Sequence, residues 1–242
     1  MIDLKGRTAI VTGASSGMGA SIARALAAEG MKVALAARRA DRLGAIVDQI
    51  AAAGGEAFAW PTDVTVEADV EALFATAHDR FGRLDLVVSC AGLPQATPIE
   101  QMSLAEWRMV LDTNLTSAFL CGREALKIMK PQGRGRVISI GSVAARSPRP
   151  DAAAYVAAKA GLDGLTRAMA LDGRDHGVAV SVLHPGLTVT GFGPGAEGRP
   201  GRMAMDPDNI AAIVVLMASL PDEQNLLEAI TLPLGMPFLG RG

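Results

Sequence analysis

Tyr155 is the single tyrosine of this 242-residue chain, and Lys159 follows it four residues later. In a helix, this spacing places a phenol and an ammonium group on one face. A free phenol has a pKa of about 10, and a cation within about 4 to 6 Å stabilises the phenolate. Lowering that pKa to about 7 takes about 4 kcal/mol, which exceeds what one partly solvated lysine supplies. The pair therefore predicts an acid–base catalyst with a second positive charge nearby.

A glycine-rich turn near the amino terminus has the pattern of a phosphate-binding site. Thr8–Val11 has the composition of a buried strand, Thr12–Gly19 (TGASSGMG) follows, and a helical pattern continues to Gly30. Glycines let the backbone approach a pyrophosphate, and a helix amino terminus favours its charge. The spacing Gly-x-x-x-Gly-x-Gly differs from the commoner Gly-x-Gly-x-x-Gly, and a plain loop is the alternative. If a dinucleotide binds here, its oxidised nicotinamide ring supplies the second positive charge.

The end of the second predicted strand, Lys32–Ala36, indicates which dinucleotide would bind. Dinucleotide folds place the residue that contacts the adenosine ribose about 20 residues after the glycine turn. Here Ala37 stands where an acidic residue is expected, and Arg38 and Arg39 follow it. Guanidinium groups suit a ribose 2′-phosphate, so the sequence predicts NADP(H) rather than NAD(H). Two solvated surface arginines are the alternative, and Arg42 is a further candidate one helical turn later.

Together with further motifs, these features resemble the short-chain dehydrogenase/reductase family, in its single-domain branch, over nearly the whole chain. The motifs that carry the resemblance occur in the family's order: Thr12–Gly19, Asp63-Val64, Asn114 in Asp-Thr-Asn-Leu, Ser142 thirteen residues before Tyr155, Lys159, Pro185-Gly186 and Thr190. The resemblance implies an α/β fold of one domain over residues 1–242, a doubly wound seven-stranded parallel sheet with helices on both faces. It also implies an NADP(H)-dependent oxidoreductase that interconverts a carbonyl compound and an alcohol.

The resemblance also implies a role for each catalytic residue. Tyr155 would donate its proton to a substrate carbonyl, and Ser142 would hydrogen-bond the same oxygen. Lys159 would lower the tyrosine pKa and hold the nicotinamide ribose, and Asn114 would fix a water that links the lysine to solvent. The structural alternatives are a strand end at Ser142 and a helix kink at Asn114. The cofactor-binding residues implied in the same way are Gly13, Ser15, Ser16, Gly17, Met18, Gly19, Arg38, Arg39, Asp63, Val64, Cys90, Ala91, Gly92, Tyr155, Lys159, Pro185, Gly186, Thr188 and Thr190.

Composition disfavours several other classes of protein. Half of the residues are apolar and the formal net charge is −2, so no basic surface recruits nucleic acid or an anionic membrane. The longest apolar stretch, 210–220, is shorter than the roughly 20 residues that span a bilayer, and the first strand begins too early for a signal peptide. We therefore expect a cytoplasmic protein. Cys90 and Cys121 suggest neither a disulfide framework nor a metal site, and no metal is expected.

Strand and helix patterns alternate along the chain, which predicts a parallel sheet covered on both faces. The predicted strands are Thr8–Val11, Lys32–Ala36, Ala57–Trp60, Leu84–Ser89, Arg136–Ile140, Val178–Leu183 and Ala229–Leu232. After the first helix, the predicted helices are Asp41–Ala53, Glu67–Phe81, Leu104–Met129, Ala153–Asp172 and Pro207–Leu220. Residues 191–206 are rich in glycine, proline and methionine and predict a mobile substrate lid. Because ligands bind beyond the carboxyl ends of such strands, we expect the motifs to converge there.

The sequence gives fewer indications of the substrate. An apolar pocket is predicted from Leu93, Pro94, Ala144, Leu187, Phe192, Met203 and Met205, with plain packing or loop positions as the alternative for the methionines and the proline. Arg146 and Arg149 either meet an anionic substrate tail or are solvated surface residues. His184 has no visible partner and is interpreted as structural.

Two departures from the family pattern concern Cys90 and the carboxyl terminus. Cys90 stands where the family commonly has an asparagine that braces neighbouring strands. The carboxyl end lacks the Asp-Gly-Gly frequent in tetrameric acyl-carrier reductases, although a homodimer or homotetramer is implied. An NAD-linked alcohol, polyol or hydroxysteroid dehydrogenase, a nicotinamide-binding redox sensor and a structural protein with the same fold remain open as alternatives.

Overall fold

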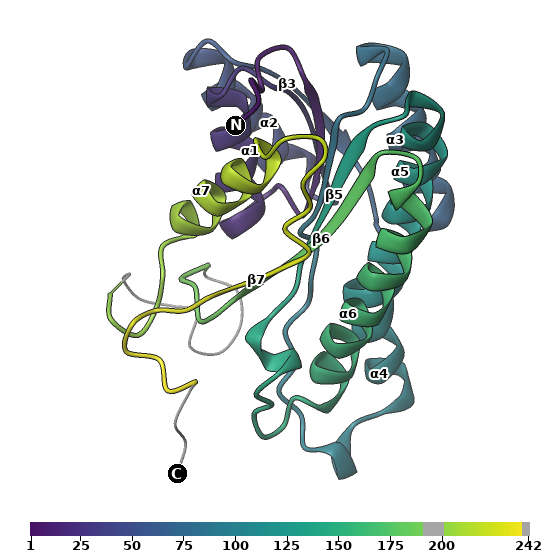
Figure 1. Cartoon of the computed structure of the whole chain (residues 1–242). Coiled ribbons are helices and arrows are strands. Elements are labelled where there is room, and N and C mark those ends of the chain that lie inside the picture. Colours follow the sequence, from purple (N-terminus) through teal and green to yellow (C-terminus); the bar gives the residue numbers. More distant parts are fainter. Residues whose placement is uncertain (191–200, 239–242) are drawn as a thin grey trace.

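A parallel sheet forms the centre of the molecule, as the alternating pattern predicts (Figure 1). The computed structural model describes residues 1–190 and 201–238. Within them, the sheet has seven strands in the order β3-β2-β1-β4-β5-β6-β7, and every pairing is parallel. The strands are β1 (Thr8–Thr12), β2 (Lys32–Ala37), β3 (Glu56–Pro61), β4 (Leu86–Ser89), β5 (Gly135–Ile140), β6 (Val178–Pro185) and β7 (Glu228–Thr231). The strand order reverses between β1 and β4, which is where such sheets bind ligands.

Helices cover both faces of the sheet, with α1, α2 and α7 on one face and α3, α5 and α6 on the other (Figure 1). The longer helices are α1 (Gly17–Ala28), α2 (Ala40–Ala52), α3 (Glu67–Phe81), α4 (Leu104–Leu111), α5 (Ser117–Gln132), α6 (Ala153–Arg174) and α7 (Pro207–Ala218). The short helical segments are η1 (Ile99–Gln101), η2 (Asp112–Thr116) and η3 (Val143–Ala145). This arrangement confirms the predicted doubly wound α/β fold.

The core explains why the strand patterns are apolar throughout rather than alternating. A parallel sheet between two helical layers is buried on both faces, and all five residues of β1 are buried. One hydrophobic cluster, which includes Leu26 and Met217, packs α1 and α7 against the sheet. A second cluster, which includes Phe74 and Met129, packs α3 and α5 against the opposite face. Both faces of the sheet are therefore fixed around the strand ends that carry the motifs.

One predicted helix differs in an informative way. The sequence predicts a single helix over Leu104–Met129, whereas the chain forms α4, then the π-helical turn η2, and then α5. The other predicted boundaries lie close to the observed ones, and the end of this helix moves from Met129 to Gln132. A π turn is rare and has no strong local sequence signal, so periodicity alone does not find it.

Only part of the predicted lid over 191–206 can be compared with the structure. Residues 191–200 lie outside the described residues. Beyond them, Met205 forms an isolated bridge with Thr188, and the Val189 amide donates to the Met205 carbonyl at 2.9 Å. Lid motion stays a prediction. Among the described residues, no helix combines the length and apolar character needed to cross a membrane.

Candidate active site

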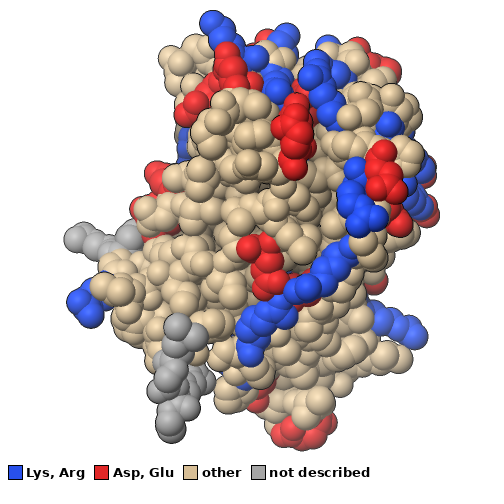
Figure 2. Space-filling model, viewed as in Figure 1, with Lys and Arg blue, Asp and Glu red and all other residues tan. Residues whose placement is uncertain are grey.

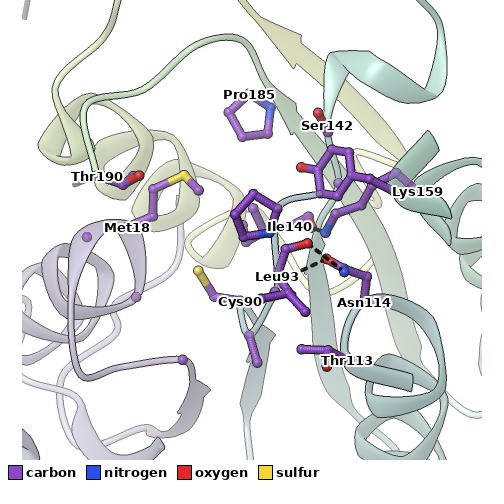
Figure 3. Close-up of a pocket in the computed structure, with 18 of the residues that line it drawn as sticks. Met18, Cys90, Leu93, Thr113, Asn114, Ile140, Ser142, Lys159, Pro185 and Thr190 are labelled. Atoms are coloured by element: carbon purple, nitrogen blue, oxygen red, sulfur yellow. Dashed lines mark hydrogen bonds between the residues drawn. The ribbon is translucent and has the colours of Figure 1, made fainter. Parts of the chain in front are cut away.

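The carboxyl ends of the central strands open into one cavity of about 930 Å³. Its lining includes every residue that the sequence predicts for catalysis or cofactor binding, so the expected convergence is confirmed. These residues are Gly13, Ser15, Ser16, Gly17, Met18, Gly19, Arg38, Arg39, Asp63, Val64, Cys90, Ala91, Gly92, Asn114, Ser142, Tyr155, Lys159, Pro185, Gly186, Thr188 and Thr190. In the view of Figure 3, Ser142, Lys159 and Asn114 lie on one side of the cavity, and Met18, Cys90 and Thr190 lie on the other.

The glycine turn between β1 and α1 requires glycine for two physical reasons. Gly13 and Gly17 have φ angles of 68° and 52°, a left-handed conformation that favours glycine. A Cβ on Gly13 would stand 2.9 Å from the Ala91 Cα, and one on Gly19 would stand 2.7 Å from the Gly13 carbonyl carbon. The described helix α1 begins with no acidic side chain in its first turn, and the Ser16 side chain makes no capping hydrogen bond. Its amino-terminal N–H groups therefore face the cavity unopposed by a carboxylate.

Arg38 and Arg39 directly follow β2 and line the cavity together with the glycine turn. Arg39 Nη2 donates to Ser15 Oγ at 2.9 Å and to Ser16 Oγ at 3.2 Å. The pKa of Asp63 is lowered by hydrogen bonds from the Thr65 hydroxyl and amide and, to a smaller degree, by the charge of Arg38. Arg42 does not line the cavity.

Cys90 occupies the end of β4 without disturbing it. The Thr12 hydroxyl accepts hydrogen bonds from the Cys90 amide at 3.1 Å and from the Ala91 amide at 3.2 Å. Thr12 therefore ties the end of β1 to the segment after β4. These two bonds fix the backbone at Cys90 and Ala91 without an amide side chain at position 90.

The thiol of Cys90 should be chemically inert although it lines the cavity. Burial raises its pKa to about 12, and the Lys159 charge offsets this only in part. A thiol with a pKa of about 12 is about 10⁻⁴ thiolate at pH 8, whereas an ordinary thiol is about one quarter thiolate. Because the thiolate is the nucleophile, we expect alkylation by iodoacetamide at pH 8 to be on the order of 10³-fold slower than for free cysteine.

Mass spectrometry of the native protein at intervals measures this alkylation. The rate should rise about tenfold per pH unit between pH 7 and 10, because the thiolate fraction does so while the pH stays below the pKa. Protein unfolded in urea is the control, because both cysteines should then react at the ordinary rate. Rapid labelling of Cys90 in the folded protein would contradict the raised pKa.

Asn114 lies in the π turn η2, and its side chain connects that turn to the segment after β4. Asn114 Nδ2 donates to the Leu93 carbonyl and to the Val110 carbonyl, both at 2.9 Å, and Oδ1 accepts from the Leu93 amide at 3.2 Å (Figure 3). The residue is buried, so these bonds satisfy polar groups that have little access to water. Asn114 therefore lies both in a π-helical turn and in the cavity wall, and its catalytic role stays a prediction.

Tyr155 and Lys159 lie in the first turns of α6, on one side of the cavity. Tyr155 is partly buried and Lys159 is buried, with its Nζ 5.8 Å from the centroid of the tyrosine ring. Lys159 Nζ donates to the Ile140 carbonyl at the end of β5, at 2.8 Å. A Cβ on Gly92 would stand 3.0 Å from Asn114 Oδ1 and 3.9 Å from Lys159 Nζ, so this glycine leaves the space beside both side chains open.

Ser142 lies two residues after β5, at a position where it both caps a short helix and lines the cavity. Its Oγ accepts from the Ala144 amide at 3.1 Å, which caps the short helix η3. The same residue lines the cavity. A hydroxyl that accepts one backbone hydrogen bond still has its proton to donate.

The expected substrate pocket is partly right. Leu93, Pro94, Ala144 and Leu187 line the cavity, whereas Phe192 lies outside the described residues. The interpretation of Met203 and Met205 was wrong: Met203 is exposed, and Met205 is buried in the core under α7. Met236, near the carboxyl terminus, lines the cavity instead, and Arg149 does so while Arg146 does not. Met109, Thr113 and Val143 also line it and were not predicted, because nothing in their local sequence indicates a cavity.

Comparisons with known proteins show which family shares this sequence and fold. A family model described as short chain dehydrogenase matches residues 7–197. A 3-oxoacyl-[acyl-carrier-protein] reductase of Synechocystis sp. is 37% identical over 228 residues, which are 91% of this chain and 92% of the relative. A 3beta-hydroxysteroid dehydrogenase of Eggerthella lenta is 41% identical over 191 residues, 78% of this chain and 73% of the relative. An alcohol dehydrogenase from the archaeon Thermococcus sibiricus, complexed with 5-hydroxy-NADP, has a TM-score of 0.89 at 31% identity and covers 95% of this chain and 97% of its own.

The fold and the site define a doubly wound α/β protein with a ligand cavity at the carboxyl ends of its central strands. The chain belongs to the short-chain dehydrogenase/reductase family and is an oxidoreductase of that type. The resemblance inferred from the sequence is thereby confirmed. Among the described residues, no group of three or more His, Cys, Asp or Glu side chains could hold a metal ion.

Proposed function

We propose that the chain interconverts a carbonyl compound and an alcohol with NADP(H), and that Tyr155 is its general acid and base. The observation that supports this most is the shared cavity, where Ser142, Tyr155 and Lys159 lie beside the glycine turn. A phenol, a hydroxyl and a buried ammonium around one space suit proton transfer to an oxygen atom. A protein that only binds a dinucleotide needs the turn but not these three side chains.

The cavity fits an NADP(H) molecule. Gly13 and Gly19 leave space that a Cβ would fill, and the amino-terminal N–H groups of α1 suit a pyrophosphate. Arg38 and Arg39 supply the positive charge that a ribose 2′-phosphate requires. When bound, the nicotinamide supplies or accepts the hydride. Lys159 holds the nicotinamide ribose in this proposal, and Asn114 shapes the cavity wall beside the lysine and fixes a water next to it.

The protein residues carry the proton chemistry. In the direction of reduction, Tyr155 gives its hydroxyl proton to the oxygen of the carbonyl as that oxygen gains negative charge. Ser142 donates a hydrogen bond to the same oxygen, which stabilises the developing charge. Lys159 favours the phenolate that remains, because its ammonium group lies on the same helix face. Oxidation of an alcohol runs the same transfers backwards.

The cofactor preference has its own test. Arg39→Ala and Arg38→Ala should each raise the KM for NADPH about 10- to 100-fold, because a charge-assisted hydrogen bond is worth about 1.5–3 kcal/mol. The KM for NADH should change by less than about threefold, since that cofactor has no 2′-phosphate. Arg42→Ala is the matched control, because this arginine is exposed and does not line the cavity. Equal effects on both cofactors would contradict the proposed phosphate contact.

An NAD-linked hydroxysteroid dehydrogenase is the second candidate, and its substrate class is favoured by the 41% identical relative that is named a 3beta-hydroxysteroid dehydrogenase. Such an enzyme would ordinarily carry an acidic side chain at position 37, where this chain has Ala37 in the cavity wall. A screen of ketones, aldehydes and alcohols with both nicotinamides separates the two candidates. Turnover with NADPH well above that with NADH supports the proposal, and the opposite ratio supports the second candidate.

A further inference from the structure

His184 lies directly behind Ser142. It belongs to β6 and is fully buried, with 0% exposure. Its Nδ1 lies 3.2 Å from the Ser142 amide nitrogen, with the geometry of a hydrogen bond, and 3.0 Å from the Ser142 carbonyl oxygen. The sequence shows no partner for this histidine, and in the structure the Ser142 backbone is its partner at Nδ1. Both polar groups of the Ser142 backbone face one edge of the imidazole ring.

Close packing fixes the ring against this backbone. A Cβ on Gly141 would stand 2.5 Å from His184 Nδ1 and 2.8 Å from Cε1, so glycine is what lets the ring approach. The Gly141 amide donates to the Leu183 carbonyl at 2.7 Å, which holds the end of β5 beside β6. The ring therefore has little freedom to move away from the peptide that joins Gly141 to Ser142.

A cluster of charged side chains surrounds the other edge of the ring. His184 Nε2 lies 3.2 Å from Asp163 Oδ1, on α6, and 3.8 Å from Glu228 Oε1, on β7. Arg146, just after η3, lies 2.7 Å from Asp163 and 2.6 Å from Glu228. Arg167, on α6, lies 2.9 Å from Glu228. Figure 2 shows acidic and basic side chains meeting where β7 lies beside α6 in Figure 1.

The charges in this cluster already balance without the histidine. Two carboxylates and two guanidinium groups meet here, and their formal charges sum to zero. The pKa of Glu228 is lowered chiefly by its hydrogen bond from Arg146. A neutral ring carries one N–H. In the Nε2–H tautomer, Nδ1 accepts from the Ser142 amide, whereas in the Nδ1–H tautomer the same nitrogen would donate to the Ser142 carbonyl. The Nε2–H tautomer is the one that avoids a lone pair facing the Asp163 carboxylate at 3.2 Å.

The contact between His184 and Asp163 is short but is not aligned as a hydrogen bond. Among the described residues, His184 Nε2 and both Asp163 carboxylate oxygens are buried without a well-aligned hydrogen-bond partner. A buried polar group without a partner costs about 1–3 kcal/mol. His184 Nε2 lies 3.2 Å from the Asp163 carboxylate and Arg146 lies 2.7 Å from the same carboxylate, so the proximity of these groups offsets part of that cost without an aligned hydrogen bond to the ring.

We propose that His184, as the Nε2–H tautomer whose Nδ1 accepts from the Ser142 amide, is a positioning residue that fixes the backbone of Ser142 and thereby aims the Ser142 hydroxyl at the reacting oxygen. The proposal rests on the proposed function of Ser142. Its consequence is that the charged cluster joining η3, α6, β6 and β7 controls the geometry of one side of the active site. A misplacement of about 1 Å at a reacting group costs up to about 100-fold in rate. A residue such as His184, which holds Ser142 without touching the substrate, therefore has a measurable effect on kcat.

Nitrogen-15 NMR of the intact, histidine-labelled protein tests the tautomer without any substrate. The chain has three histidines, His78, His176 and His184, and the spectrum of a His184→Asn variant identifies the signals of the buried ring. At pH 8 we expect Nδ1 to resonate as an unprotonated nitrogen and Nε2 to carry the hydrogen. A hydrogen on Nδ1, or rapid exchange between the tautomers, would overturn the proposal even if the enzyme is active.

Kinetics on the best carbonyl compound of the activity screen test the positioning. His184→Leu fills the volume but cannot accept from the Ser142 amide, so kcat should fall about 10- to 100-fold while the KM for NADPH stays within about twofold. His184→Asn places an amide oxygen near the position of Nδ1 and should restore kcat to within about fivefold of the parent.

The matched control is His176→Leu, because His176 is exposed in the turn before β6 and should leave every parameter unchanged. A structural role alone would lower the melting temperature of both His184 variants without separating kcat from KM. A kcat of His184→Leu equal to that of the parent, or a kcat of His184→Asn as low as that of the leucine variant, would overturn the proposal. If no carbonyl compound is turned over by the parent, the proposed function fails, whereas the NMR result still decides the tautomer.

Discussion

Tyr155→Phe is expected to lower kcat by about 10²- to 10⁴-fold for every carbonyl substrate, with little change in the affinity for NADPH. The substitution removes one oxygen atom and keeps the ring, which packs in the cavity wall on α6. General acid–base catalysis is commonly worth a factor of this size, because the substrate oxygen must otherwise take its proton from water. The chain has no other tyrosine that could replace the lost donor.

Two measurements separate the loss of chemistry from a loss of binding. Consumption of NADPH at saturating substrate gives kcat, and a fluorescence titration with NADPH in the absence of substrate gives the dissociation constant. A parent-like dissociation constant with little turnover would support the proton-donor role and exclude a protein that only senses the cofactor. Ser142→Ala should reduce kcat by about 10²- to 10³-fold and serves for comparison, because it removes a stabilising donor while the proton source remains. Parent-like turnover by Tyr155→Phe would disprove the assignment of the general acid.

The sequence was sufficient for the fold and for the convergence of the catalytic and cofactor motifs on one cavity, for a physical reason. In a parallel α/β sheet, burial on both faces forces apolar strands, and the strand ends must meet at one edge. Local patterns such as Thr8–Val11 and Glu67–Phe81 therefore determine where the turns that follow them lie. Motifs far apart in the chain, such as Gly13 and Tyr155, converge because of this rule and not because of any pairing signal between them.

Contacts between side chains that lie far apart along the chain could not be predicted from the sequence. Thr12 was predicted only as a part of the glycine turn, and its hydroxyl is the group that braces the segment after β4. Likewise, Asp163 had no visible link to His184, because a helix and a strand must pack before the two meet. The alternatives for Arg146 differed in whether it reached a substrate, and the structure turns it toward Asp163 and Glu228. Long-range pairs of this kind leave no periodic signal in a single sequence.

Gly19→Ala is expected to weaken NADPH binding by about tenfold or more, the equivalent of about 1.4 kcal/mol. The added Cβ would overlap the carbonyl oxygen of Gly13 and stand 3.1 Å from the Ala14 Cα. These neighbours are backbone atoms, so α1 must shift away from the turn whose N–H groups face the cavity. Alanine favours a helix over glycine by about 0.5–1 kcal/mol, whereas overpacking of this kind costs about 1–3 kcal/mol, so the strain exceeds the gain.

Gly44→Ala provides the matched control for this substitution. Gly44 lies inside helix α2, and a Cβ placed there meets nothing within 4 Å. The same helix preference should then raise the free energy of unfolding by about 0.5–1 kcal/mol and leave the NADPH dissociation constant unchanged. Thermal unfolding and a fluorescence titration on both variants measure the two effects. A Gly19→Ala protein that is stabilised as much as Gly44→Ala and binds NADPH like the parent would show that the close approach of α1 to the turn does not shape the cofactor site.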